Sequence, residues 1–312
     1  MNEIFVLPSF DFDQWCAQHR TSVEAKLDLW VPGFVGAVVP AGLSQLNEAM
    51  RYAVLGGGKR VRPLLALAAC EALRGDVGQA MRAACSVELI HAYSLVHDDM
   101  PCMDNDVMRR GKATVHVKYG QAQALLAGDA LQALAFELLT PQDDAAAVAL
   151  QGYLCQILAK AAGSAGMAGG QAIDLASVGM ALSADQLHDM HRLKTGALLQ
   201  ASVLMGAHCG TATGPVLKAL QDYGSAVGLA FQVVDDVLDV TADSVTLGKT
   251  SGKDAAHNKP TFVSLLGLDA ANAYAQQLLA QALASLDSLQ THGFDNTHAL
   301  RGLADMLVNR QH

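Results

Sequence analysis

Aromatic and charged side chains are scarce in this chain. Aromatic residues make up 5% and charged residues 16% of the 312 residues, whereas 51% are hydrophobic. Basic residues are too few to balance the acids, and the formal net charge is −9. Nucleic-acid-binding surfaces usually carry positive charge, so this composition argues against a nucleic acid as the partner. A small anionic substrate would depend on local basic loops or on metal ions.

Paired cysteines and long apolar runs are also missing. No CxxC spacing relates the cysteines, which indicates small core residues in a reducing compartment. They are Cys16, Cys70, Cys85, Cys102, Cys155 and Cys209. The first apolar run, Ile4 to Leu7, is too short for a signal peptide, and no stretch reaches the ~18 uninterrupted apolar residues of a membrane span. We therefore expect a cytoplasmic protein without a membrane span.

Runs of β-branched residues are short, whereas alanine and leucine dominate, and this predicts an all-α protein. No linker or long low-complexity segment divides the chain, so we predict a single domain over residues 1–312 with a variable lead-in over 1–40. Ser183 is predicted to cap the helix that carries His191, Lys194 and Thr195. Helical periodicity predicts helices over 13–29, 43–55, 121–139, 145–162 and 223–241 and further helices over 269–310. A glycine-rich break over 163–170 is typical of a close helix–helix contact.

Residues 88–106 (ELIHAYSLVHDDMPCMDND) concentrate acids and histidines. Apolar residues at helical spacing predict that their first half ends a buried helix, and the proline of this segment should end it near Asp99. His91, Ser94 and Asp98 would then share one face of the helix. Carboxylates at a helix C-terminus lie at the negative end of its dipole and call for a cation. Oxygen ligands of this kind suit Mg²⁺, although an isolated acidic cluster can also be a solvated loop.

Three loops rich in lysine or arginine accompany the acids, over 56–63, 109–112 and 248–259. In the first, glycines with exposed backbone N–H groups stand beside three cations, and a proline follows that can open a helix. This combination favours a clamp for a diphosphate, and the alternative is an ordinary turn with a basic rim. The first and third loops both fail to fit the GxxxxGK[ST] frame of a P-loop. The cations of the first loop are Lys59, Arg60 and Arg62.

A second acidic cluster lies on the helix predicted over 223–241. Gln232, Asp235, Asp236 and Asp239 recur at i, i+3, i+4 and i+7, which places them in one narrow stripe. The rest of this helix is apolar, so it should be buried. Because unpaired buried carboxylates are costly, the stripe must face a cavity, cations or water.

Two acidic clusters, each followed by a basic loop, can face one cavity and hold several Mg²⁺ ions against a diphosphate. No Ser-His-Asp or Cys-His set stands out, so a nucleophile supplied by the protein is not expected. The chemistry that fits is metal-assisted departure of diphosphate, with charge stabilisation as the main effect. Mn²⁺ could substitute for Mg²⁺.

Together these motifs resemble those of the trans-isoprenyl diphosphate synthases, the polyprenyl synthetase family. The similarity runs from about residue 42 to 268, and several motifs in one order are far more specific than either acidic cluster alone. The matching segments are 57–63 (GGKRVRP), 91–104, 109–111 (RRG), 194–196 (KTG) and 231–239 (FQVVDDVLD). The resemblance implies an all-α isoprenoid synthase fold, a helical bundle around a deep central cavity, assembled as a homodimer.

The resemblance also implies a role for each matching residue. Metal ligands on an allylic diphosphate would be Asp98, Asp99 and Asp104 of the first motif and Asp235, Asp236 and Asp239 of the second. Further contacts to the allylic substrate would come from Arg109, Lys194, Thr195, Gln232, Lys249 and Lys259. Isopentenyl diphosphate would bind to Lys59, Arg62, His91 and Arg110. The residues expected to act in catalysis are Asp98, Asp99, Asp104, Arg109, Lys194, Asp235 and Asp236.

The implied reaction is chain elongation. Dimethylallyl or geranyl diphosphate would lose diphosphate, the double bond of isopentenyl diphosphate would attack the resulting cation, and proton loss would give a chain five carbons longer. A terpene cyclase has no need of Lys59, Arg62 and His91 for a second diphosphate. A non-catalytic, regulatory subunit of a heteromeric prenyl synthase tends to lose one aspartate motif, and both are present here.

Product length in the family depends on residues just upstream of the first motif. Tyr93, with Ser94 beside it, and the insertion of Met100 and Pro101 resemble bacterial farnesyl diphosphate synthases (geranyltranstransferases). This favours farnesyl diphosphate (C15), with geranylgeranyl diphosphate (C20) as the alternative. Tyr93 falls about 140° from Asp98 on a helical wheel, so its place in the cavity depends on the resemblance. Relatives often carry another acid where this chain has a valine, at position 107.

Overall fold

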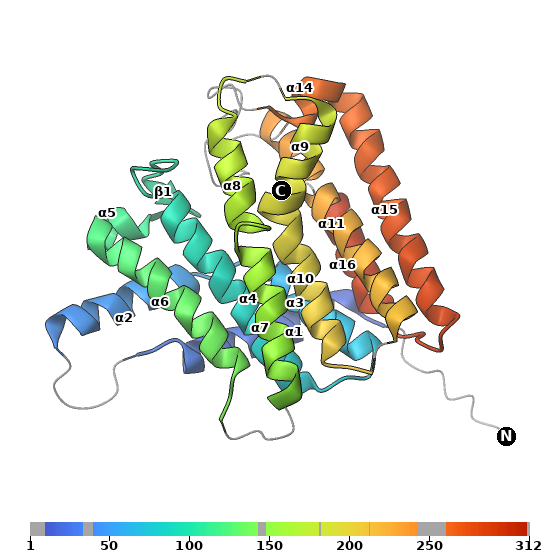
Figure 1. Ribbon diagram of the computed structural model, residues 1–312, viewed down its shortest axis with the longest axis horizontal. Helices are drawn as coiled ribbons and strands as arrows, with labels where there is room; N and C mark the ends of the chain where they lie inside the picture. Colours follow the sequence, from blue (N-terminus) through green and yellow to red (C-terminus); the bar gives the residue numbers. More distant parts are fainter. Residues whose placement is uncertain are drawn as a thin grey trace.

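The computed structural model describes residues 10–33, 40–142, 148–180, 182–211, 213–241 and 260–310. Over these ranges the chain is almost entirely helical, which confirms the all-α prediction (Figure 1). The two strands among them, β1 (Met108–Arg109) and β2 (Lys112–Ala113), pair as a short antiparallel hairpin that carries the second basic loop.

The described helices keep the labels of Figure 1. In the first half of the chain they are α1 (Phe12–Trp30), α2 (Ala41–Val54), α3 (Val61–Ala72), α4 (Val77–Asp98), α5 (Val115–Tyr119), α6 (Gln121–Leu139) and α7 (Val148–Ala162). In the second half they are α8 (Met167–Ala176), α9 (Ala184–His191), the π-helix η2 (Arg192–Gly196), α10 (Ala197–His208), α11 (Gly214–Thr241), α14 (Phe262–Leu266), α15 (Leu268–Gln290) and α16 (His298–Val308).

Two buried clusters share α3 and α10. One cluster joins these helices to α11, α15 and α16, and the other joins them to α4, α6 and α7. Leu65 and Leu67 of α3 illustrate the division, because they are both buried yet belong to different clusters. Helices that are apolar around most of their circumference occupy the centre of a bundle. Figure 1 shows α10 between the α4–α6 side of the molecule and the α11–α15 side.

Most helices lie where the periodicity predicts them. Helix α6 matches its predicted range, α4 ends at Asp98 with Asp99 as its C-cap, and Ser183 forms a capping box with Gln186 at the start of α9. Three boundaries differ. Helix α11 begins at Gly214 rather than near 223, since the proline that follows is compatible with a first turn. The glycine-rich break is shorter than predicted because α8 already begins at Met167, and α3 begins two residues before Pro63.

One described helix is long and apolar enough, by length and composition, to cross a membrane. This helix is α6, and 44% of its most apolar window is buried inside the protein. Its buried residues, which include Leu131 and Ala135, belong to the cluster formed with α4. Packing within the bundle accounts for the buried part of its apolar surface, whereas Leu125 and Leu126 are exposed.

Arg60 links three helices from inside the protein instead of lining the basic loop. It adopts a left-handed backbone conformation (φ 51°), and its side chain is 3% exposed. The guanidinium donates to Glu24 of α1 at 2.7 Å, to Glu88 of α4 at 2.6 Å and to the carbonyl oxygen of Val54 at 2.7 Å. The expectation that Arg60 serves the diphosphate clamp is therefore replaced by a structural role.

Substituting Arg60 with alanine should destabilise the fold by about 3–5 kcal/mol, because the buried carboxylate of Glu88 would lose its partner. The control is Glu24→Gln, since the Glu24 side chain is 36% exposed and its loss should cost less than ~1 kcal/mol. Urea unfolding of both variants measures the difference. Equal losses in the two variants would show that the buried ion pair does not hold the helices together.

Candidate active site

A cavity of about 360 Å³ opens between α4, α8 and η2, with Arg62 of α3 at one side. It brings together predicted residues that lie far apart in the sequence. Those that line it are Arg62, His91, Tyr93, Ser94, Asp98, Lys194 and Thr195. The spacing of His91, Ser94 and Asp98 predicts one shared face of α4, and all three meet the same cavity. Tyr93 lines it as well, because the cavity covers a wider arc of the helix than the wheel arithmetic allows.

Asp98 is the only described lining residue of this cavity that carries a carboxyl group. Burial raises its pKa to about 6, and the negative charges of Asp104 and Asp99 add to this, whereas Lys194 and Arg109 oppose it. A carboxylate with this pKa gains free energy from any additional cation that reaches it. Asp98 is therefore suited to bind a metal ion.

Asp99 faces a different hollow from Asp98, since successive helical residues point about 100° apart. Arg109 donates to both oxygens of Asp99, with its Nε atom at 2.8 and 2.9 Å and its Nη2 atom at 2.6 Å. Together with Arg110 and Lys112 they line a smaller hollow of about 70 Å³. Burial raises the pKa of Asp99 in spite of this bidentate pair. The assignments of Asp99 and Arg109 to metal and allylic substrate stay predictions.

The first and second basic loops meet. Arg110 donates from Nη1 to the carbonyl oxygen of Gly57 at 2.8 Å. Burial, followed by the charges of Arg62 and Arg110, holds the pKa of His91 well below its usual range, so this imidazole is neutral. Burial also lowers the pKa values of Lys59, Arg62 and Arg110. A bound polyanion such as a diphosphate would stabilise the charged forms of these side chains.

Lys194 and Thr195 lie on η2, the π-helical turn that continues α9. The ammonium group of Lys194 donates to Oδ2 of Asp174 at 2.5 Å, and Thr195 donates to the side-chain oxygen of Gln232 at 3.0 Å. π-Helical turns inserted into α-helices are frequent at functional sites. This one directs two adjacent side chains to partners on α8 and α11.

Glycines hold η2 close to both of its neighbours. A Cβ atom at Gly170 of α8 would lie 2.1 Å from the backbone nitrogen of Lys194. A Cβ atom at Gly228 of α11 would lie 2.8 Å from Cα of Gly196. The close helix contact expected from the glycine-rich segment is thus present at Gly170, and it fixes the position of Lys194.

The acids of the second cluster have different surroundings. Asp235 accepts from Arg310 at 2.6 Å. Asp236 is buried and accepts from the amide of Gln232 at 2.9 Å and from the backbone N–H of Phe262 at 2.7 Å. Oδ1 of Asp239 is buried and has no hydrogen-bond partner among the described residues. The hydrogen bonds from Thr195 through Gln232 to Asp236 connect this cluster to the wall of the cavity.

The described residues contain no group of three His, Cys, Asp or Glu side chains arranged to hold a metal ion. The donor set nevertheless fits Mg²⁺, which prefers carboxylate oxygens, keeps several waters and shares its coordination shell with phosphates. The raised pKa of Asp98 and the unpartnered oxygen of Asp239 are the features that a cation would stabilise. Oxygens of a bound diphosphate would complete the coordination shell of such an ion.

Two residues of the site, Asp174 and Gln171, have no role predicted from the sequence. Asp174 is buried against Lys194, and both side-chain polar atoms of Gln171 are buried at the cavity without a hydrogen-bond partner among the described residues. The sequence feature that could have identified Gln171 and Asp174 is their i, i+3 spacing on the otherwise apolar helix α8. The same feature identified the acidic stripe of α11. The predicted substrate contacts Lys249 and Lys259 lie outside the described residues.

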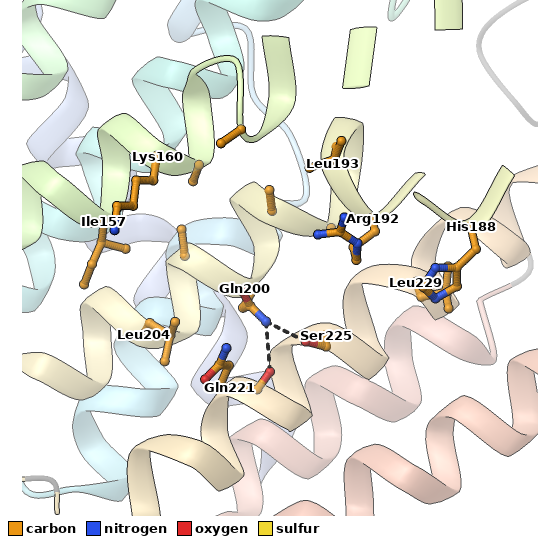
Figure 2. Close-up of a pocket in the computed structure, with 15 residues that line it drawn as sticks. Ile157, Lys160, His188, Arg192, Leu193, Gln200, Leu204, Gln221, Ser225 and Leu229 are labelled. Carbon is orange, nitrogen blue, oxygen red and sulfur yellow. Dashed lines mark hydrogen bonds between the residues drawn. The ribbon is translucent and has the colours of Figure 1, made fainter. Parts of the chain in front are cut away.

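A second cavity, of about 590 Å³, lies on the other side of η2 (Figure 2). Whereas Lys194 and Thr195 face the first cavity, Arg192 lines the second. Gln200 crosses its floor and donates to Oγ of Ser225 at 2.5 Å and to the carbonyl oxygen of Gln221 at 3.2 Å. Its described lining includes no carboxylate, so it lacks the donors that a hard metal ion requires.

Comparison with known proteins identifies a family and close relatives. Residues 43–292 match the Polyprenyl synthetase family. A chloroplastic geranylgeranyl pyrophosphate synthase of Capsicum annuum is 43% identical over 96% of this chain and 79% of that protein. Geranylgeranyl pyrophosphate synthase 4 of Arabidopsis thaliana is 40% identical over 97% of this chain and 79% of that protein.

Solved structures agree with the sequence relatives. An FPP/GFPP synthase of Zymomonas mobilis superposes with a TM-score of 0.81 at 39% identity, covering 95% of this chain and 98% of that one. A geranyltransferase of Helicobacter pylori, crystallised with magnesium and isoprenyl diphosphate, gives a TM-score of 0.80 at 36% identity, covering 97% of this chain and 98% of that one. At these identities the likeness extends beyond the fold.

Gly170→Ala should lower prenyltransferase turnover by about 10²-fold. The added methyl group would collide with the backbone of Lys194 and push its ammonium group out of place. The matched control is Gly152→Ala on α7, where a Cβ atom meets nothing within 4 Å. Steady-state kinetics of both variants checks the expectation. Wild-type turnover in Gly170→Ala would show that the position of Lys194 is not critical.

Proposed function

Because the chain belongs to the polyprenyl synthetase family, we propose that it condenses isopentenyl diphosphate with dimethylallyl or geranyl diphosphate and releases diphosphate. The observation that carries this proposal is that two different groups of side chains line one cavity. Asp98 offers a metal-binding carboxylate and Lys194 a cation, whereas Arg62 offers a second cation and His91, about two turns before Asp98 on α4, a neutral imidazole. Two diphosphates need two such sites.

The residues act on the two substrates in different ways. Bound Mg²⁺, held by Asp98, Asp104 and the acids of α11, would supply the positive charge that stabilises diphosphate as a leaving group. Lys194 is fixed by Asp174 beside the same acid, so its ammonium group can contact the allylic diphosphate. Assignment of Asp99, Asp235, Asp236 and Asp239 to the metal ions belongs to the same proposal.

Isopentenyl diphosphate would bind between the first and second basic loops. Lys59, Arg62 and Arg110 supply positive charge, and neutral His91 can donate one hydrogen bond without adding another cation. The bound diphosphate would reduce the repulsion among these groups, and this favours a diphosphate-binding site between the two loops.

The remaining lining of the cavity suits a prenyl chain. Met167, Ala168, Ala172 and Leu175 of α8 present an apolar wall opposite α4. Such a wall excludes water from an allylic cation and accepts an extended hydrocarbon chain. The same cavity therefore combines diphosphate recognition with protection of the reactive end.

Product length has two candidates. We propose geranylgeranyl diphosphate, because the curated relatives described above are named geranylgeranyl pyrophosphate synthases. This favours the alternative of the sequence analysis over its first expectation. Farnesyl diphosphate is the second candidate on one structural observation, the ring of Tyr93 in the cavity wall, packed edge-on against His97 with centroids 5.7 Å apart.

We also propose a homodimer in the cytoplasm. Exposed apolar side chains on the adjacent helices α6, α7 and α8 support a dimer contact, and Figure 1 shows these helices along one face. They are Leu125, Leu126, Tyr153 and Ile173. Large exposed apolar surfaces of this kind usually mark contacts with other proteins.

The first test is to incubate the protein with isopentenyl diphosphate, dimethylallyl diphosphate and Mg²⁺ and to identify the dephosphorylated alcohols by chromatography. We expect elongated prenyl alcohols, with geranylgeraniol as the end product. Farnesol alone would support the second candidate, and the absence of any elongated product would contradict the proposed function.

Asp98→Ala should lower turnover by about 10²–10³-fold through lost charge stabilisation. Asp129→Ala, an exposed position on α6, is the control.

Tyr93→Ala should lengthen the product by at least one isoprene unit if the ring limits the depth of the cavity. Product analysis with the same substrates measures this shift. Leu29→Ala serves as the control, because Leu29 is exposed on α1 at 68% and lies outside the described lining of the cavity. Identical product lengths for wild type and Tyr93→Ala would place the limiting residue elsewhere.

A further inference from the structure

Arg310, at the end of the described chain, reaches the second acidic cluster. Its Nη2 atom donates to Oδ1 of Asp235 at 2.6 Å and to the carbonyl oxygen of Phe231 at 3.0 Å. Its guanidinium carbon lies 4.1 Å from the ring centroid of Phe231. The Arg310 side chain is only 11% exposed, so this is not a loose surface contact.

Neighbouring contacts keep Arg310 in this position. Helix α16 packs against α11 and α3, and just beyond its end Asn309 accepts a hydrogen bond from Gln276 of α15 at 2.9 Å. Arg310 also lies within electrostatic reach of the first basic loop, because its charge is the largest contribution after burial to the lowered pKa of Lys59. The guanidinium is therefore close to both Asp235 and the first basic loop.

We propose that Arg310 is a positioning residue that neutralises Asp235 in the metal-free protein and gives up this carboxylate when Mg²⁺ binds. The inference rests on the proposed function, which makes Asp235 a metal ligand. Arg310 would thereby hold the second acidic cluster in place at low Mg²⁺ and raise the concentration of Mg²⁺ needed to occupy it. It acts through Asp235 and does not itself touch the reacting atoms.

A divalent ion can replace Arg310 as the partner of Asp235. Arg310 holds Asp235 through one guanidinium nitrogen and one carboxylate oxygen, and the Asp235 side chain is 36% exposed, so a divalent ion can approach it. A partly exposed, monodentate ion pair is much weaker than a buried bidentate pair. After the exchange, Arg310 keeps its hydrogen bond to Phe231 and its position over the aromatic ring, so it need not move into the core.

Mg²⁺ titrations of the substrate-free protein, followed by thermal unfolding and isothermal calorimetry, test this proposal. Arg310→Gln should bind Mg²⁺ about tenfold more tightly than wild type, because the competing cation is gone. Arg310→Lys retains the charge and should stay close to wild type. Adding Asp235→Asn to Arg310→Gln should abolish the gain, since the two changes act on one interaction.

The matched control is Arg301→Gln on α16, because the carboxylate paired with Arg301 is the exposed Asp287 and not a predicted metal ligand. Its affinity for Mg²⁺ should equal that of wild type. Unchanged or weaker Mg²⁺ binding in Arg310→Gln would overturn the proposal, as would an equal gain in Arg301→Gln. Because the titration needs no turnover, a wild-type protein that makes no prenyl product would contradict the proposed function and still leave this result readable.

Discussion

Buried carboxylates placed next to fixed cations are the constraint on which this structure depends. Asp98 lies at the C-terminal end of α4, where the helix dipole and burial both oppose its charge. Lys194 faces it from η2, and Lys194 is itself held by buried Asp174. The charge of Lys194 partly offsets the effect of burial on the pKa of Asp98. The helices that carry them must therefore pack at close distance, and the glycines at 170 and 228 allow this.

The same constraint explains why one fold can manage two diphosphates. Near the C-terminal end of α4, Asp98 has a raised pKa and is suited to a metal ion. About two turns earlier on the same helix, neutral His91 lies within electrostatic reach of Arg62 and Arg110. Both groups of side chains are set on regular helices or on short loops tied to them, such as the loop in which Arg110 donates to Gly57. Bound metal ions and diphosphates would neutralise the charges that the protein leaves without full compensation. Such preorganised charge is the main source of catalysis in reactions that expel an anion.

Much of this arrangement could be predicted from the sequence. Helical periodicity located α4 and α6, and the i, i+3, i+7 spacing placed His91, Ser94 and Asp98 on one wall. Other features depend on contacts between residues distant in sequence and leave no local pattern. Arg60 turns inward because Glu24 and Glu88 lie there. Nothing in the sequence near Arg310 indicates that the end of the chain reaches Asp235.

The central claim is that the acids and the cations form one site, which binds Mg²⁺ and diphosphate cooperatively. The most direct test compares the melting temperature of the protein with Mg²⁺ alone, with inorganic diphosphate alone and with both. A ligand that binds only the folded state raises the melting temperature by an amount that grows with its concentration relative to its dissociation constant. We predict that the two together raise it by more than the sum of their separate effects. Strictly additive effects would contradict the account, because they would mean that metal and diphosphate bind at independent sites.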